Sequence, residues 1–270
     1  MKLTRRVTFS SGHRYWLTSL SEAENRARFG VWASPYNHGH NYVLDVTTEG
    51  DVDPETGMVI NIKRIDDLLK THIVHAFDQR SLNDEVPAFR DQPSTLENLL
   101  YHIAAELGPL LQNPARLTHL RLEEMPTLWA ELDLKTNMTT LTRTYEFAAS
   151  HRLHVESMSQ AENDELFGKC NNPAGHGHNY LLEVTVSGSP DPLTGMLVDL
   201  GALDDAVNRL VVDRYDHRNL NCDVPELVGQ VTTSEVVSQA IWNQLNGKLP
   251  APLYRVRLHE TARNIFEVTA

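Results

Sequence analysis

Three histidines in the second half of the chain have the type and spacing of a metal site: His151, His176 and His178. His176 and His178 lie two residues apart in a segment that is expected to lead into a strand, and in a strand residues i and i+2 point to the same side. His151 ends the preceding expected strand. Three imidazoles with an open fourth position are the ligand set of catalytic zinc sites, although the spacing alone does not exclude other imidazole-binding metals. The pattern predicts one Zn²⁺ in this half.

The first half of the chain repeats the second at a spacing of 138 residues, which is the signature of a tandem duplication. The three histidines return as His13, His38 and His40. Near its end the second copy is shorter by two residues, so that Glu124 corresponds to Glu260. Because the histidines return in register, we expect a metal site in each copy. The predicted domains are residues 1–137 and 138–270, with a linker near residues 134–142.

Each copy reads as strand, loop, strand, helix, helix, strand, strand. A Ser or Thr three residues before a Glu predicts the start of the second helix at Thr232 and Glu235, and likewise at Ser94 and Glu97. Strands flanking two helices predict an α+β fold, an antiparallel four-stranded sheet with two helices on one face. Such sheets have open edges, so we expect closure by oligomerisation. In the second copy we expect strands at residues 142–149, 179–186, 253–260 and 263–269, and a helix at residues 200–212.

Composition and charge exclude several classes of protein. With 41% hydrophobic and 22% charged residues in 270, the chain is typical of a globular protein of two domains. A net charge of −12 argues against nucleic acid as a partner, since that binding requires clustered Lys and Arg. Neither a membrane span nor a secretory signal is recognisable, so we expect a cytoplasmic protein with no membrane partner.

Cys170 is the candidate reactive group of the second copy. Only two cysteines are present, too few for a disulfide framework. Lys169, Asn171 and Asn172 surround Cys170 and argue against the alternative of a small buried apolar residue. A nearby cation lowers a thiol pKa from about 8.5 towards neutrality, which suits a general base. Cys222 has no such neighbours and is expected to be structural.

The segments that carry these residues resemble a known enzyme family. They read SHRL at 150–153, LFGKCNNP at 166–173 and HGHNY at 176–180. They are similar to 6-pyruvoyltetrahydropterin synthase and to its bacterial relative, 6-carboxytetrahydropterin synthase. Five residues separate Cys170 from His176, which favours the pyruvoyl enzymes over the carboxy enzymes. The resemblance covers nearly all of the second copy and, more weakly, the first.

The resemblance implies a fold, a reaction and a set of roles. The fold is the T-fold, three of which close into a barrel, with two barrels stacked head to head. The implied reaction is a lyase reaction on a small pterin, in which 7,8-dihydroneopterin triphosphate loses triphosphate and becomes 6-pyruvoyltetrahydropterin. The implied roles are Cys170 as general base, Asp216 and His217 as a relay from a neighbouring unit, Glu260 as pterin anchor, and Thr233 and Ser234 as backbone contacts to the pterin.

Simpler interpretations of these residues remain open. Thr233 and Ser234 could belong only to a helix start. Asp216 and His217 could form a local turn, and Glu260 could be a solvated strand residue. Three other functions also remain: 6-carboxytetrahydropterin synthase for deazapurine (queuosine) biosynthesis, a non-catalytic pterin- or zinc-binding scaffold, and a zinc hydrolase.

The first copy keeps the histidines but lacks the reactive groups. Trp32 stands at the position of Cys170, Gln79 at that of His217 and Leu96 at that of Ser234. We therefore expect a catalytically degenerate first copy that binds metal structurally. Because Cys170 would need His217 from another second copy, we expect a homotrimer that imitates a hexamer, with three second copies in one ring and three first copies in the other.

Overall fold

The computed structural model describes all 270 residues as two compact units. Unit 1 contains Met1–Leu141 together with Ser187–Gly201, and unit 2 contains Thr142–Val186 with Ala202–Ala270. Unit 1 is therefore the first copy plus a short segment of the second.

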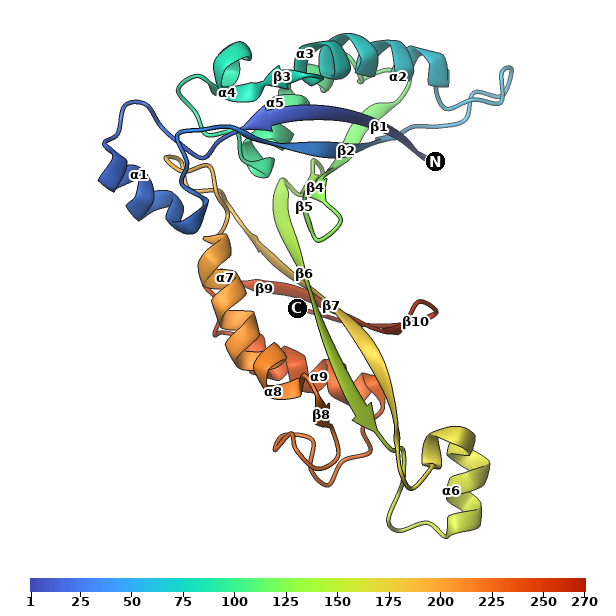
Figure 1. The fold of residues 1–270 in the computed structure, drawn as a ribbon. Helices are drawn as coiled ribbons and strands as arrows, with labels where there is room; N and C mark the ends of the chain where they lie inside the picture. Colours follow the sequence, from blue (N-terminus) through green and yellow to red (C-terminus); the bar gives the residue numbers. More distant parts are fainter. The chain divides into compact units, whose positions relative to one another are not determined.

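The sheet of unit 1 has the strand order β5-β4-β2-β1-β3. β1, β2, β4 and β5 pair antiparallel, while the two-residue β3 runs parallel to β1. The long β1–β2 pair is in register from Lys2 opposite Glu49 to His13 opposite His38, which brings two of the predicted ligands to one end of the ladder (Figure 1). The strands are β1 (Lys2–His13), β2 (His38–Glu49), β3 (Arg80–Ser81), β4 (Arg116–Met125) and β5 (Leu128–Asp133).

The helices of unit 1 pack apolar side chains against this sheet. Residues of α2 such as Ile65 and of α5 such as Ile103 are fully buried, as is Leu44 of β2. α2 contacts β1, and α5 contacts β4 and β5. A π-helical stretch, Lys70–Val74, joins α2 to α3. The helices are α1 (Glu22–Phe29), α2 (Ile62–Leu69), α3 (His75–Phe77), α4 (Leu82–Glu85) and α5 (Leu96–Leu107).

Unit 2 repeats the strands of unit 1 in the same order, and it has helices equivalent to α1, α2, α3 and α5 but none equivalent to α4. Its strands follow the order β10-β9-β7-β6, and β8 runs parallel to β6. α9 contacts β9 and β10. The strands are β6 (Met138–His151), β7 (His176–Gly188), β8 (Arg218–Asn219), β9 (Leu253–Thr261) and β10 (Asn264–Thr269); the helices are α6 (Gln160–Phe167), α7 (Leu200–Val207), α8 (Asp213–Tyr215) and α9 (Ser234–Leu245).

The predicted mixture of helices and antiparallel strands is confirmed, but two helix predictions were wrong. The expected loop between the first two strands of each copy contains a helix, α1 or α6. Each has a complete capping box, Ser21 with Glu24 and Ser159 with Glu162. The later helices start one residue after the predicted position, because Thr95 and Thr233 are the N-caps and accept the amides three residues ahead.

The predicted linker at residues 134–142 is a tight turn followed by a strand. β5 ends at Asp133 and β6 begins at Met138. Asp133 Oδ1 accepts the backbone amides of Lys135 and Thr136, and Asn137 has a φ of 56°, a conformation that Asn tolerates. No flexible connection is therefore built into this stretch.

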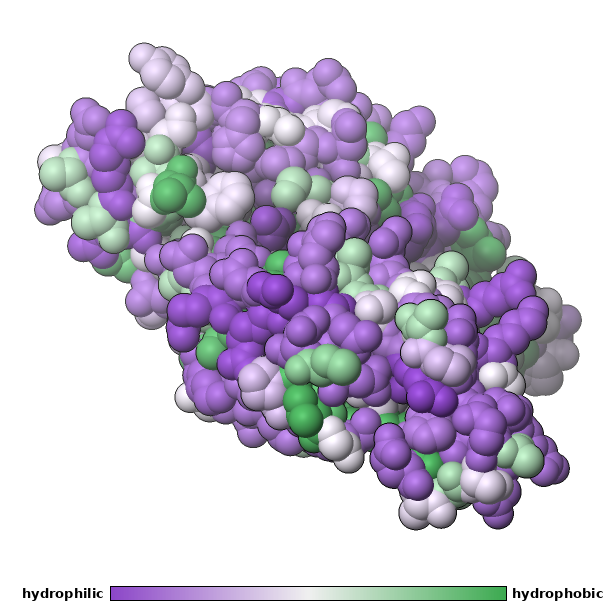
Figure 2. Space-filling model, turned by 60° about the horizontal axis from the view of Figure 1, so that its bottom comes forward, coloured by the Kyte–Doolittle hydropathy of each residue, from purple (hydrophilic) through white to green (hydrophobic).

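The surface is mostly hydrophilic. Figure 2 shows one face on which hydrophobic residues occur in small, separated groups. None of the helices has the length and apolar character that crossing a membrane requires. Among the exposed large hydrophobic residues are Met58 and Ile62, which lie just before α2 and at its first residue.

Candidate metal and pterin site

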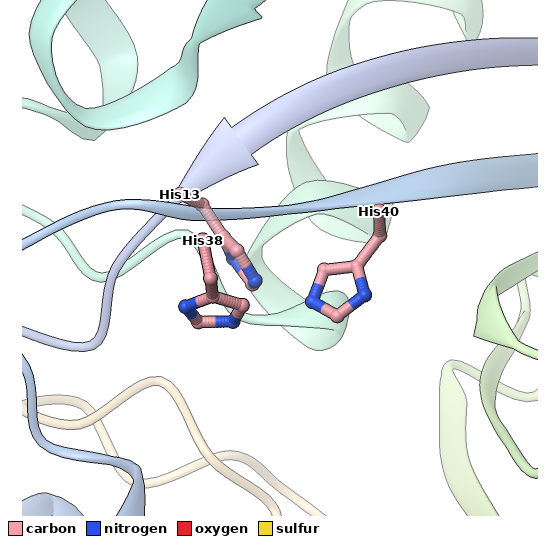
Figure 3. A group of neighbouring side chains, drawn as sticks. All are labelled: His13, His38 and His40. Carbon is pink, nitrogen blue, oxygen red and sulfur yellow. The ribbon is translucent and has the colours of Figure 1, made fainter.

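The structure brings both predicted histidine trios together. One candidate ligand atom from each of His151, His176 and His178 lies within 4.8 Å of the others, and the same holds for His13, His38 and His40. Ring centroids in unit 2 are 4.6, 5.3 and 5.0 Å apart, against 4.5, 5.1 and 5.0 Å in unit 1. Figure 3 shows the unit 1 rings on one side of β1 and β2. The two trios therefore have nearly the same geometry.

Backbone carbonyls orient the central histidine of each trio. His151 Nδ1 lies 2.8 Å from the carbonyl oxygen of Thr232, and His13 Nδ1 lies 3.0 Å from that of Ser94. A carbonyl only accepts, so Nδ1 carries the proton and Nε2 presents a lone pair. The Nε2 atoms of His151 and His13 are buried without a hydrogen-bond partner. A metal ion between the rings would satisfy them, and this is the usual arrangement of a ligating histidine.

Burial favours the neutral form of several of these imidazoles. It lowers the pKa of His13 to about 3 and that of His40 to about 4. It also lowers the pKa of His151 and of His176. A neutral imidazole is the form that binds a metal. Both trios therefore fit a cation, and three nitrogen ligands suit zinc.

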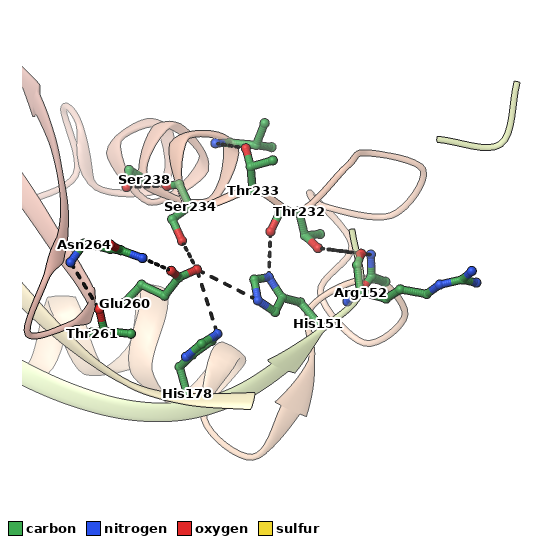
Figure 4. Close-up of polar contacts among 12 residues, drawn as sticks. His151, Arg152, His178, Thr232, Thr233, Ser234, Ser238, Glu260, Thr261 and Asn264 are labelled. Carbon is green, nitrogen blue, oxygen red and sulfur yellow. Dashed lines mark hydrogen bonds and ion pairs between the residues drawn. The ribbon is translucent and has the colours of Figure 1, made fainter. Parts of the chain in front are cut away.

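Glu260 lies beside the unit 2 trio and is held by two donors. Ser234 Oγ donates to Oε1 at 2.7 Å and Asn264 Nδ2 donates to Oε2 at 3.0 Å (Figure 4). Oε1 is also 3.9 Å from Nε2 of both His151 and His178. Burial raises the pKa of Glu260, but the hydrogen bonds from Asn264 and Ser234 outweigh it and lower the pKa below the ordinary value. The side chain is therefore an oriented carboxylate.

The equivalent carboxylate of unit 1, Glu124, has lost both of these donors. Leu96 stands at the position of Ser234 and Leu128 at that of Asn264. Glu124 Oε1 instead lies 3.3 Å from Nε2 of His40. The two donors that hold Glu260 are thus replaced by apolar residues on different elements of unit 1.

Cys170 lies in a 3-10 turn, Gly168–Asn171, that is hydrogen-bonded to the two residues after His151. Its carbonyl oxygen accepts the amide of Leu153 at 2.9 Å. The buried Asn171 side chain accepts Arg152 Nη2 at 2.9 Å, and Arg152 Nε donates to the Asn171 carbonyl at 3.0 Å. Cys170 is a half-buried free thiol and is not a member of the histidine cluster. Arg152 therefore positions the turn that carries the thiol.

The same arginine has another partner in the first copy. Arg14 Nη2 bonds Asp84 Oδ1 at 2.6 Å, and Cys222 stands at the position of Asp84 in the second copy. Without that acid, Arg152 is available for Asn171, whose position is Ala33 in the first copy. Cys222 is exposed and lies with Arg152 at the edge of a cavity of about 600 Å³, which the sequence did not indicate.

Asp216 and His217 form a pair, as the resemblance implied, but Asp216 also has a structural task. Its Oδ2 is 2.8 Å from His217 Nδ1, while its Oδ1 accepts the amide of Ala148 at 2.7 Å. Asp78 makes the equivalent backbone bond to Ser10 in unit 1. Asp216 and Asp78 therefore both have a structural role in their copy. Of the pair, only His217 differs between the copies, because the first copy has Gln79 at that position. The side chain of His217 is 84% exposed and lines a cavity of about 480 Å³ together with His178.

Thr233 and Ser234, at the helix start that was predicted to contact a pterin, make different contacts. Thr233 is the N-cap of α9, and its Oγ1 accepts the amide of Val236 at 3.4 Å. Ser234 contributes its side chain to Glu260, as described above. The sequence did not single out the carbonyl of Thr232 or the side chain of Asn264. Comparison of the copies could have found Asn264, because the first copy has Leu128 there.

The chain is similar to known proteins of one family. The family model described as 6-pyruvoyl tetrahydropterin synthase matches residues 2–135 and again residues 140–270. The 6-pyruvoyl tetrahydrobiopterin synthase of Poecilia reticulata is 47% identical over 126 residues, which are 46% of this chain and 86% of the relative. A solved structure of the Caenorhabditis elegans 6-pyruvoyl tetrahydropterin synthase is 44% identical and covers 49% of this chain and 96% of its own, with a TM-score of 0.47. The 6-carboxy-5,6,7,8-tetrahydropterin synthase of Rickettsia bellii (strain RML369-C) is 27% identical over 149 residues, which are 49% of this chain and 99% of the relative.

The fold and the site thus define a tandem pterin-synthase-type lyase. The chain belongs to the 6-pyruvoyl tetrahydropterin synthase family, which it matches twice. The predicted family and the predicted enzyme class are confirmed.

Proposed function

We propose that the second copy is a zinc-dependent lyase that converts 7,8-dihydroneopterin triphosphate to 6-pyruvoyltetrahydropterin and releases triphosphate. The observation that carries the proposal is the combination of a histidine trio with a carboxylate held by two donors, Ser234 and Asn264. The trio and the carboxylate both lie in the second copy, which also contains Cys170. The relative from Poecilia reticulata, at 47% identity, supports the pyruvoyl product.

His151, His176 and His178 would hold the metal. When bound, zinc supplies Lewis-acid polarisation of a substrate oxygen. Imidazoles bind a metal in their neutral form, so the three ligands would leave the double positive charge of the ion undiminished. This favours loss of a proton from a neighbouring carbon, because the developing negative charge is stabilised.

The chain's own residues supply the remaining roles. Cys170, as a thiolate, accepts a proton from the substrate side chain. Glu260 accepts paired N–H donors of the pterin ring, which matches the geometry of a carboxylate. In the pair with Asp216, His217 donates from Nδ1 to the carboxylate and presents Nε2 to a group of a neighbouring unit. Thr233 and Ser234 present backbone groups to the pterin from the start of α9.

We propose that the first copy binds metal without turnover. Its trio has the same ring distances, but Trp32, Gln79 and Leu96 replace the thiol, the relay histidine and the serine donor. The T-fold sheets are proposed to close into barrels by oligomerisation, since a single unit leaves strand edges open. A cytoplasmic location remains a prediction.

The test is product analysis by mass spectrometry after incubation with 7,8-dihydroneopterin triphosphate. We expect the mass of 6-pyruvoyltetrahydropterin and free triphosphate from the wild-type chain and from Trp32→Ala, and neither from Cys170→Ala. The two variants are matched because they occupy the same position in the two copies. Turnover by Cys170→Ala at the wild-type rate would refute the assignment.

The same measurement separates the other functions. A product with the mass of 6-carboxytetrahydropterin would identify the alternative reaction. The relative named for that reaction, from Rickettsia bellii, is less similar to this chain, at 27% identity. Pterin binding without turnover would identify a scaffold. Zinc-dependent esterase activity that persists after thiol alkylation would identify a hydrolase.

A further inference from the structure

The first copy keeps a carboxylate beside its histidine trio although the groups around it are replaced. Glu124 stands at the position of Glu260. The positions of the thiol, the relay histidine and the two donors to the carboxylate carry Trp32, Gln79, Leu96 and Leu128. Without the thiol and the two donors, the anchoring role proposed for the second copy does not explain this carboxylate.

Glu124 lies against two rings of its trio. Its Oε1 is 3.3 Å from Nε2 of His40, and its Oε2 is 4.0 Å from Nε2 of His13. In the second copy, Glu260 Oε1 is 3.9 Å from Nε2 of two histidines of the trio. One oxygen of Glu124 therefore approaches a ligand nitrogen more closely than Glu260 does.

The contact between Glu124 and His40 is not a hydrogen bond. Nε2 of His40 is buried and has no hydrogen-bond partner, although the carboxylate oxygen is 3.3 Å away. Two atoms that bind one zinc ion at the usual distances of about 2.0–2.1 Å in a tetrahedron lie about 3.3 Å apart. The two atoms thus have the separation expected of two ligands of one ion.

The burial of Glu124 also favours a cation at this position. Its side chain is 6% exposed, against 15% for Glu260. A carboxylate is buried at low cost only when it is paired with positive charge. A divalent ion held by the trio would supply that charge directly beside it.

The second copy holds its carboxylate in a different way. Ser234 Oγ and Asn264 Nδ2 each donate to one oxygen of Glu260. Leu96 and Leu128 cannot donate from the equivalent positions of the first copy. These two hydrogen bonds therefore compete with a metal ion for the carboxylate in the second copy, and not in the first.

We propose that Glu124 is the fourth protein ligand of the metal site in the first copy. Three imidazole nitrogens and one carboxylate oxygen fill the tetrahedral shell of zinc. The three histidines alone form the group whose ligand atoms all lie within 4.8 Å of one another, so the carboxylate completes the site by a small approach when the ion binds. This inference rests on the metal binding proposed for the first copy.

The fourth ligand makes the two sites different in kind. A site with four protein ligands is closed and structural, whereas a site with three protein ligands keeps an open position for water or substrate. Glu124 thereby excludes a substrate from the ion of the first copy. The same carboxylate position closes one site and leaves the other open, depending on whether two neighbouring donors are present.

The test uses chains that keep one site each and are loaded with one Co²⁺ per chain. The His151→Ala chain keeps the first-copy site, and the His13→Ala chain keeps the second-copy site. Visible absorption of Co²⁺ reports its coordination geometry, and azide is the probe because it binds an ion at an open position. Azide should change the absorption of the His13→Ala chain and leave that of the His151→Ala chain as it is.

Glu124→Gln, added to the His151→Ala chain, removes the ligand and keeps the size of the side chain. Co²⁺ should bind at least about tenfold more weakly, since groups that only orient ligands already contribute about 10- to 100-fold to metal affinity. The absorption should then respond to azide. Glu123→Gln is the matched control on the same strand, because Glu123 accepts Arg121 Nη2 at 2.8 Å and is not a member of the trio. It should leave both readouts unchanged.

The outcomes separate this inference from the proposal on which it rests. A His151→Ala chain that binds no Co²⁺ would show that the first copy has no metal site, and the inference would fail with it. A chain that binds Co²⁺ but responds to azide, or keeps its affinity in a folded Glu124→Gln variant, would retain the metal and overturn only the fourth ligand. Circular dichroism shows whether the variant is folded, and the azide comparison needs no change at Glu124. None of these readouts involves turnover.

Discussion

Removal of one hydroxyl, in Ser234→Ala, should reduce turnover while the metal stays bound. Ser234 Oγ is 2.7 Å from Glu260 Oε1, and it is one of two donors that orient this carboxylate. The serine touches no histidine of the trio in the contacts described. The variant therefore separates the orientation of Glu260 from the presence of a metal.

The size of the effect follows from the hydrogen bond that is lost. A hydrogen bond to a charged group contributes about 1.5–3 kcal/mol, which corresponds to roughly 10- to 100-fold in kcat/KM if the orientation is used in the transition state. Asn264 still holds Oε2, and the Glu260 side chain is 15% exposed, so water can replace part of the lost bond. We therefore expect a decrease of about tenfold, at the lower end of this range.

The assay is kcat/KM for 7,8-dihydroneopterin triphosphate together with metal content per chain. Ser238→Ala is the control, because Ser238 is buried on the same helix and donates to the carbonyl of Ser234 at 2.6 Å without touching Glu260. Wild-type kcat/KM in Ser234→Ala would refute the role of the serine. A parallel loss of metal would show that the hydroxyl acts on the trio and not on the carboxylate.

Three further predictions concern the thiol, the metal and a buried acid. Cys170→Ala should reduce kcat by about 10²- to 10⁴-fold, the usual contribution of a general base, with unchanged metal content by atomic emission. The wild-type chain should bind two metal ions; His151→Ala and His13→Ala should each lose one, and only His151→Ala should lose activity. Burial raises the pKa of Glu97, so the folded state holds the proton of this carboxyl more tightly than the unfolded state does. The proton therefore contributes to the free energy of unfolding below about pH 4.5, the ordinary value. That contribution is lost as the pH rises through the pKa of the folded state. Thermal melting should thus show that Glu97→Gln stabilises the chain at pH 8 more than at pH 4.5, and equal gains at both values would contradict this.

The clustering of the histidine trio could be predicted from the sequence because it depends on local information. Strand alternation places His176 and His178 on one side, and the repeat shows that His151 belongs with them. The strand register then needs only to bring the end of β6 to the start of β7. The equivalent pair in unit 1, His13 opposite His38, shows that the long ladder does so.

The groups that orient the site could not be predicted because they come from distant parts of the chain. The carbonyl of Thr232 that holds His151 is a backbone group 81 residues away, and any residue type could supply it. The predicted cap at Thr232 failed for a related reason. Two adjacent threonines precede α9, and Thr232 Oγ1 is used by tertiary contacts with Asn221 and the Arg152 carbonyl, so Thr233 caps the helix.

The replacements in the first copy belong together physically, which explains why the copies differ in some residues and not in others. Ser94 and the strands hold the histidine trio of the first copy, so the metal site proposed there needs no substrate. Leu96 and Leu128 remove the donors of the anchor carboxylate and in the same step provide the apolar surface on which Met196, Val198 and Leu200 pack. The loss of a polar pocket and the gain of an internal interface are therefore one change. This predicts that Leu96→Ser weakens unit 1 through its contact with these residues, and that it restores no turnover as long as Trp32 replaces the thiol.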